Sequence, residues 1–234
     1  KETRNFVLRG NICYSLDPTT LETIEAGYLV CEDGTSAGVY RELPEQYAGW
    51  PLKDFGDRLI IPGLTDLHLH APQYGFRGLG MDLELLEWLN TRTFPEEAKY
   101  GDLEYARRGY TIFAGNMKRS ATTRACIFAT IHRESTVMLM DLMEETGLKT
   151  MVNMDRNSPD ILIEESAEAS ARDTLAWLEQ IHGRYENTRP ILTPRFIPSC
   201  TDELMGRLKE IQRDFDLPVQ SHLSENKGEI DWVK

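Results

Sequence analysis

The sequence predicts an α/β fold, and two patterns carry that prediction. From residue 58 onward, short apolar runs of strand length alternate with amphipathic segments of helix length, which is typical of parallel strands joined by crossover helices. Histidines stand at the ends of the first and fifth of these strands, as expected of a site at the mouth of a TIM-type (β/α)8 barrel. Such a barrel takes about 250 residues. Only about 177 follow residue 57, so the pattern predicts a barrel truncated after its fifth strand.

The first 57 residues predict a separate β layer. Short strand-like runs within residues 4–40 are divided by turn signals at Asp17-Pro18 and Asp33-Gly34. Residues 41–57 are polar and contain two prolines and two glycines, which indicates a connector of loop or helix. We therefore expect a small β-sandwich-like N-terminal domain at residues 1–57, followed by a partial (β/α) barrel at residues 58–234 that carries the histidines.

Hydrophobic periodicity and capping signals give the expected bounds of the barrel elements. We expect strands at residues 58–70, 122–131, 149–155, 191–198 and 217–222. Helices are expected at 83–90, with Asp82 as the N-cap, and at 103–118, 135–146, 163–185 and 202–215. A long loop with three glycines separates His70 from Asp82. Loops of this length at the C-terminal end of a strand are often functional.

Composition argues against several classes of function. The formal net charge of −12 and the absence of any Lys/Arg cluster argue against a nucleic acid or an anionic membrane as the partner. A small, uncharged or weakly charged substrate fits better. The four cysteines are scattered without a C-x-x-C pair, which predicts the reduced thiols of a cytoplasmic protein. The sequence has no segment typical of a signal peptide and no run of about 18 apolar residues.

Three histidines predict a metal site. His68 and His70 are two residues apart on a strand, so their imidazoles share a face. Alone they could equally belong to an exposed edge strand, because a metal site needs more than two ligands. His222 adds a third imidazole at the end of the fifth strand, and such a set suits zinc or iron. Glu225 follows three residues later, where a carboxylate could move protons between a metal-activated water and a substrate.

Five motifs follow one another along the chain: PGLTDLHLHAPQY (62–74), LLEWLNTRTFPEE (85–97), ACIFATIH (125–132), LTPRF (192–196) and QSHLSEN (220–226). Together and in this order they resemble the motifs of the metal-dependent amidohydrolases and, within them, the guanine deaminase family. The resemblance implies that His68, His70 and His222 bind one divalent metal, zinc or alternatively iron, and that Glu225 handles protons. It also implies that Gln73 and Arg195 hydrogen-bond the purine edges and that Phe196 lies against the ring.

The implied activity is hydrolytic deamination of guanine to xanthine and ammonia. The implied partner is a small-molecule purine rather than nucleic acid or membrane, and the complete protein is expected to be a homodimer. The chain stops before the sixth-strand His and eighth-strand Asp of the family, and Ala121 stands where a glycine is expected. Two alternatives therefore stay open. One is an amidohydrolase that acts on another aminated heterocycle, and the other is an inactive metal-binding fragment.

Overall fold

The structure is a computed structural model that describes residues 4–153, 155–156 and 166–234. The chain divides into two compact units, Lys1–Gly63 and Leu64–Lys234, each with its own hydrophobic core. The boundary expected near residue 57 stays a prediction. Among the described residues, no helix combines the length and the apolar character that crossing a bilayer requires.

The first unit is a four-stranded sheet with the strand order β3-β2-β1-β4. The turn after β2 is formed by Asp33 and Gly34, both with positive φ, as the Asp-Gly signal predicts for a tight hairpin. The prediction of a connector over residues 41–57 is wrong for its last part, because β4 begins at Leu52 and pairs in parallel with β1. Its exposed polar residues resemble a loop in sequence. The strands are β1 (Phe6–Asp17), β2 (Thr20–Glu32), β3 (Thr35–Tyr40) and β4 (Leu52–Ile60).

The second unit contains a parallel four-stranded sheet with the order β5-β6-β7-β9, which confirms the α/β class. In the described residues this sheet is open rather than closed into a barrel. The strands are β5 (Leu64–His70), β6 (Thr122–Phe128), β7 (Lys149–Asn153) and β9 (Thr188–Pro190), and a separate short parallel pair consists of β8 (Asp155–Arg156) and β10 (Thr193–Pro194).

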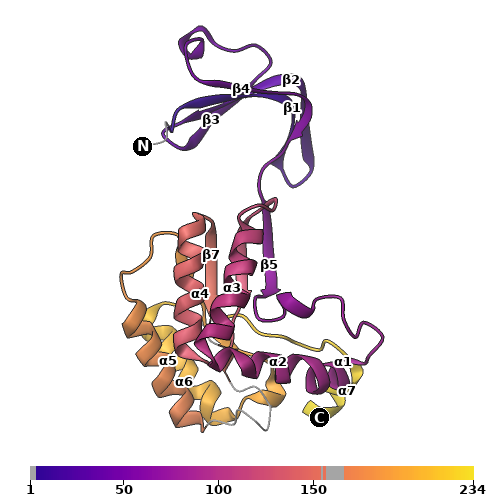
Figure 1. The fold of residues 1–234 in the computed structure, drawn as a ribbon, viewed down its shortest axis with the longest axis vertical. Coiled ribbons are helices and arrows are strands. Elements are labelled where there is room, and N and C mark those ends of the chain that lie inside the picture. The colour runs from indigo at the N-terminus through magenta and orange to yellow at the C-terminus, as the bar shows by residue number, and fades with distance from the viewer. Residues whose placement is uncertain (1–3, 154, 157–165) are drawn as a thin grey trace. The chain divides into compact units, whose positions relative to one another are not determined.

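Helices cover this sheet, and α3 and α4 pack side by side (Figure 1). Side-chain caps start several of the helices; Asp102, Ser166 and Thr201, for example, accept hydrogen bonds from backbone N–H groups of the first turn. The buried side chains between sheet and helices include Ile127, Leu139 and Trp177. The helices are α1 (Leu85–Trp88), α2 (Phe94–Ala98), α3 (Leu103–Met117), α4 (Arg133–Thr146), α5 (Ala167–Ile181), α6 (Asp202–Phe215) and α7 (Lys227–Val233).

Two helix predictions are corrected. The first helix begins at Leu85 and is capped by the side chain of Glu84 rather than by Asp82. It continues through a π-helical segment, Leu89–Thr93, into α2. Pro95 lacks the N–H that an α-helix would use at this place, which accounts for the widened turn. Residues 163–165 of the helix expected at 163–185 lie outside the described residues, and α5 ends earlier, at Ile181.

The last two predicted strands are much shorter than expected. Only Thr193–Pro194 of residues 191–198 is a strand, and residues 217–222 contain a single bridge from Val219 to Leu192. Prolines interrupt the ladder because they lack the N–H that a strand must donate. The two segments nevertheless run in parallel, since Gln220 N donates to Leu192 O at 2.9 Å and His222 N to Arg195 O at 2.8 Å.

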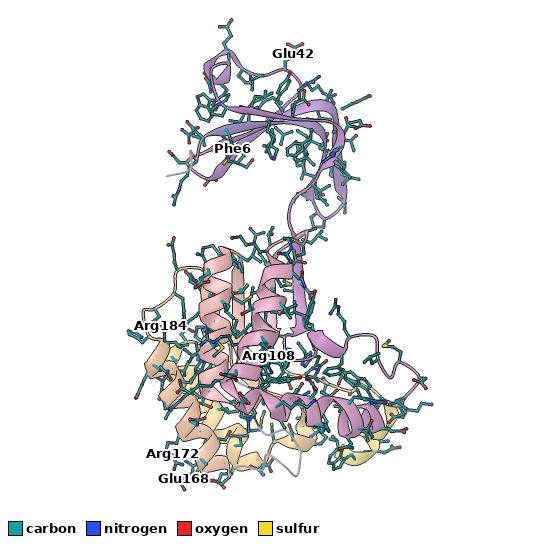
Figure 2. The ribbon with its side chains drawn as sticks, in the orientation of Figure 1. Phe6, Glu42, Arg108, Glu168, Arg172 and Arg184 are labelled. Carbon is teal, nitrogen blue, oxygen red and sulfur yellow. The ribbon has the colours of Figure 1, made fainter. Side chains whose placement is uncertain are left out.

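The loop that leads into β9 is held by one carboxylate on α4. Glu144 accepts hydrogen bonds from the backbone N–H groups of Glu186, Asn187 and Thr188 at 2.8–3.2 Å. Arg184, labelled in Figure 2, adds an ion pair to Asp141 of the same helix at 2.8 Å. Desolvation alone would raise the pKa of Glu144, but the backbone donors outweigh it, and the pKa lies below its ordinary value of 4.5.

We expect Glu144→Gln to lower the free energy of unfolding by roughly 1 kcal/mol at pH 7. Hydrogen bonds to a charged group contribute more than those between neutral groups, but the partial solvation of this carboxylate reduces the effect. Because the pKa of Glu144 is lower in the folded state, the carboxylate contributes stability above pH 4.5, and this contribution is lost as the pH falls through the folded-state pKa. The difference in stability between the unmodified protein and Glu144→Gln should therefore shrink in acid. Denaturant unfolding at pH 7 and at an acidic pH below 4.5 measures this difference in stability. Glu145→Gln, at an exposed neighbour, is the control, and equal stability of the two variants would contradict the assignment.

Candidate metal centre and substrate pocket

The structure brings the three predicted histidines together. His68 and His70 end β5, and the ligand nitrogens of His68, His70 and His222 all lie within 4.8 Å of one another. The Nε2 atoms of His70 and His222 are 3.1 Å apart. Nitrogens bound to one tetrahedral zinc ion lie roughly 3.3 Å apart. Two of the rings are therefore at ligand spacing, and a ligand nitrogen of His68 lies within 4.8 Å of each of them.

The protonation of these rings also fits a metal. His222 Nδ1 lies 2.7 Å from the backbone oxygen of Arg195, which can only accept, so Nδ1 carries the proton and Nε2 keeps its lone pair. Burial lowers the pKa of His222 to about 4 and the pKa of His70 well below its ordinary value. Burial also lowers the pKa of His68, against the opposing charge of Asp66. All three rings are thus neutral at neutral pH, as metal ligation requires.

Phe128 is a residue of this centre that sequence reasoning missed. It is fully buried at the end of β6, and its ring centroid lies 4.3 Å from that of His70, 4.5 Å from that of His222 and 4.9 Å from that of His68. One aromatic ring thereby packs against all three imidazoles and restricts their orientation. In the sequence it lies inside the strand expected at residues 122–131, where nothing distinguishes it from a core aromatic.

The histidines form one side of a pocket of about 270 Å³. In Figure 1, α1 and α2 lie below the arrowhead that ends β5, and α1 contributes Leu85 and Trp88 to the pocket wall. The pocket is lined by all seven predicted site residues and by three apolar ones: His68, His70, Gln73, Leu85, Trp88, Leu89, Arg195, Phe196, His222 and Glu225.

The polar part of the pocket wall is built on a buried ion pair. Arg195 is 2% exposed, and its Nη1 donates to Glu97 Oε2 at 2.6 Å and its Nη2 to Glu97 Oε1 at 3.3 Å. Gln73 Nε2 donates to the same Oε1 atom at 3.1 Å. Sequence reasoning missed Glu97, because in the run FPEE nothing distinguishes it from the neighbouring Glu96.

Glu225 lies on the exposed rim of the pocket, on a loop with defined geometry. The buried carboxylate of Glu229 accepts hydrogen bonds from the backbone N–H groups of Ser224 and Glu225 at 3.1 and 2.6 Å. This contact holds Ser224 in the left-handed region, with φ at +54°. Partial burial, then the charge of Glu229, raises the pKa of Glu225 against the opposing effect of Arg195. The spacing Asn226-x-x-Glu229, a capping-box pattern, was the signal in the sequence for Glu229.

The α/β fold and the histidine centre define a class of protein. A model of the amidohydrolase family matches residues 59–234, and the chain belongs to this family. A guanine deaminase of Dictyostelium discoideum is 43% identical over 185 residues, which are 77% of this chain and 41% of that protein. A human guanine deaminase is 40% identical over 179 residues, 75% of this chain and 39% of that protein.

A solved structure is similar over nearly the whole chain. The crystal structure of guanine deaminase from C. acetobutylicum with guanine bound in its active site superposes with a TM-score of 0.89 at 40% identity. The superposition covers 96% of this chain and 54% of that one. This chain therefore spans about half of that structure and about two fifths of the curated relatives.

Proposed function

We propose that the protein that carries this chain hydrolyses guanine to xanthine and ammonia. The observation that supports this most is a single pocket that is lined by three neutral histidines, the buried Arg195 and the half-buried Gln73. The histidines are a ligand set for a metal, and the other two side chains are a set of hydrogen-bonding groups for a polar heterocycle. The guanine deaminases that resemble this chain at 40–43% identity support the choice of guanine.

In this proposal His68, His70 and His222 hold one divalent metal, zinc or alternatively iron. Such a metal, when bound, activates a water molecule for attack on the amino-bearing carbon of the purine. Glu225 takes a proton from that water and delivers it to the amino group, so that the carbon–nitrogen bond breaks and ammonia leaves. Partial burial raises the pKa of Glu225 above its ordinary value, which is the direction that general acid–base catalysis favours.

In this proposal the side chains of Arg195 and Gln73 recognise the purine. Arg195 donates to the ring carbonyl of guanine, and Gln73 pairs with the adjacent ring N–H. Phe196, which is 3% exposed, and the side chains of Leu85 and Trp88 enclose the flat ring. Adenine presents an amino group where guanine presents its carbonyl, so it would leave donors of Arg195 without an acceptor.

We expect Arg195→Lys to lower kcat/KM for guanine by one to two orders of magnitude and to narrow the preference for guanine over adenine. Lysine keeps the charge but lacks the planar fork, and an unmet buried hydrogen bond costs about 1–3 kcal/mol. Steady-state kinetics with both purines measures this. Arg189→Lys, at an exposed arginine of β9, is the control. An unchanged preference in Arg195→Lys would exclude this role.

The test of the activity itself is a product analysis. The full-length protein loaded with zinc should convert guanine to xanthine and ammonia in equal amounts, and a chelator should abolish the conversion. No xanthine, with turnover of a different aminated heterocycle such as an aminotriazine, would replace the proposal with the related heterocycle deaminase. No turnover of either, with metal still bound, would favour an inactive metal-binding protein.

The proposal extends to the architecture. We propose that the parallel sheet of the second unit belongs to a (β/α)8 barrel and that residues 1–57 form a separate domain. We also propose a cytoplasmic homodimer as the working state. The similarity to the guanine deaminase of C. acetobutylicum supports the barrel, and sedimentation of the full-length protein tests the dimer.

A further inference from the structure

Glu97 is a buried acid that the proposed reaction does not use. It is 4% exposed on α2, and its two oxygens accept three hydrogen bonds, two from Arg195 and one from Gln73. Its neighbour Glu96 instead pairs with Lys99 toward the solvent side, at 2.6 Å. Burial of a carboxylate is costly unless it is paired and hydrogen-bonded, and here both partners line the pocket.

The chemistry of the carboxylate dictates how Gln73 is oriented. A carboxylate paired with a guanidinium is ionised and can only accept hydrogen bonds. The amide of Gln73 must therefore present its NH2 group to Glu97. Because the NH2 group and the oxygen of an amide point in different directions from one carbon, the oxygen of Gln73 points away from Glu97. The two-point contact fixes the plane of the Arg195 guanidinium in the same way.

We propose that Glu97 is a positioning residue: it fixes which of the two purine-recognising side chains, Arg195 and Gln73, donates a hydrogen bond toward the pocket and which accepts one. It makes Gln73 a hydrogen-bond acceptor toward the pocket and keeps Arg195 a donor beside it. This order matches a lactam edge, in which a ring carbonyl stands next to a ring N–H, and it mismatches an amino group next to a bare ring nitrogen. The inference rests on the proposed function, because it names the feature by which that site selects oxo purines.

The test replaces Glu97 with Gln in the full-length protein, with Glu96→Gln as the matched control. The new amide can donate to Gln73, which lets the Gln73 amide turn and removes the fixed polarity. We expect the ratio of kcat/KM for guanine to that for adenine to fall at least tenfold. Binding of hypoxanthine, which has the lactam edge but no amino group to lose, should weaken at least tenfold as measured by calorimetry. The control should change neither quantity more than twofold.

A third variant separates positioning from a structural role. Glu97→Asp keeps a group that only accepts, so it should keep most of the preference for guanine even where the rate falls. Equal losses for guanine and adenine in Glu97→Gln, or a larger loss of preference in Glu97→Asp, would overturn the inference. If Glu97→Gln does not fold, Glu97→Asp alone decides by whether the preference survives.

The proposed function fails independently of this inference. An unmodified protein that does not convert guanine, yet binds hypoxanthine at least tenfold more tightly than adenine and loses that difference in Glu97→Gln, would refute the activity and support the role of Glu97. Conversion of guanine by the unmodified protein, together with a Glu97→Gln variant that keeps the full preference for guanine over adenine, would support the activity and refute the role of Glu97.

Discussion

The variant Glu225→Gln is expected to lower guanine turnover by roughly two to four orders of magnitude, the range of general acid–base groups. The amide is close in size to the carboxylate but cannot take up and release a proton at neutral pH. Glu225 lines the pocket three residues after His222, and Glu229 holds the backbone of its loop. The expected loss is in kcat, because Glu225 is assigned to the proton transfers and not to purine binding.

Metal content separates this role from ligation. Glu225→Gln should retain as much zinc as the unmodified protein, measured by atomic absorption after gel filtration. Glu210→Gln, the same change at an exposed position of α6, should retain both metal and activity. Loss of zinc from Glu225→Gln would reassign Glu225 as a metal ligand.

The variant His68→Ala is expected to weaken zinc binding by about 100-fold or more, since loss even of a residue that only orients a ligand costs 10–100-fold. His68 is exposed, so its removal should leave the fold intact. Zinc titration with a competing chelator measures the affinity, and the rise in melting temperature on addition of zinc should disappear in the variant.

His182→Ala is the matched control, because His182 is exposed at the C-terminal end of α5, outside the histidine centre. It should bind zinc as the unmodified protein does. Identical zinc affinities for His68→Ala and His182→Ala would show that the cluster at the end of β5 is not the metal site.

Sequence patterns were informative where one residue type repeats along a regular element. The His-x-His spacing on β5 predicted that two imidazoles share a face, and the alternation of strands and helices predicted the parallel sheet. The position of His222 at the end of a later segment then predicted the third member. These inferences need only the period of a strand and the common edge of a parallel sheet.

The sequence was uninformative where the role of a residue depends on a tertiary contact. Glu97 and Glu96 are adjacent acids in one short helix, and only packing buries the first against Arg195 and leaves the second beside Lys99. Phe128 resembles any other core aromatic until the histidines are placed against it. The proline-rich segments also misled, because apolar runs predicted strands where missing N–H groups prevent a ladder.

One measurement tests the central claim most directly: a competition assay with equal concentrations of guanine and adenine and the full-length, zinc-loaded protein. The buried donor Arg195 and the acceptor that Glu97 makes of Gln73 should both favour guanine, so xanthine should accumulate at least tenfold faster than hypoxanthine. Equal rates of formation of xanthine and hypoxanthine would contradict the account, because they would show that neither side chain distinguishes a carbonyl from an amino group.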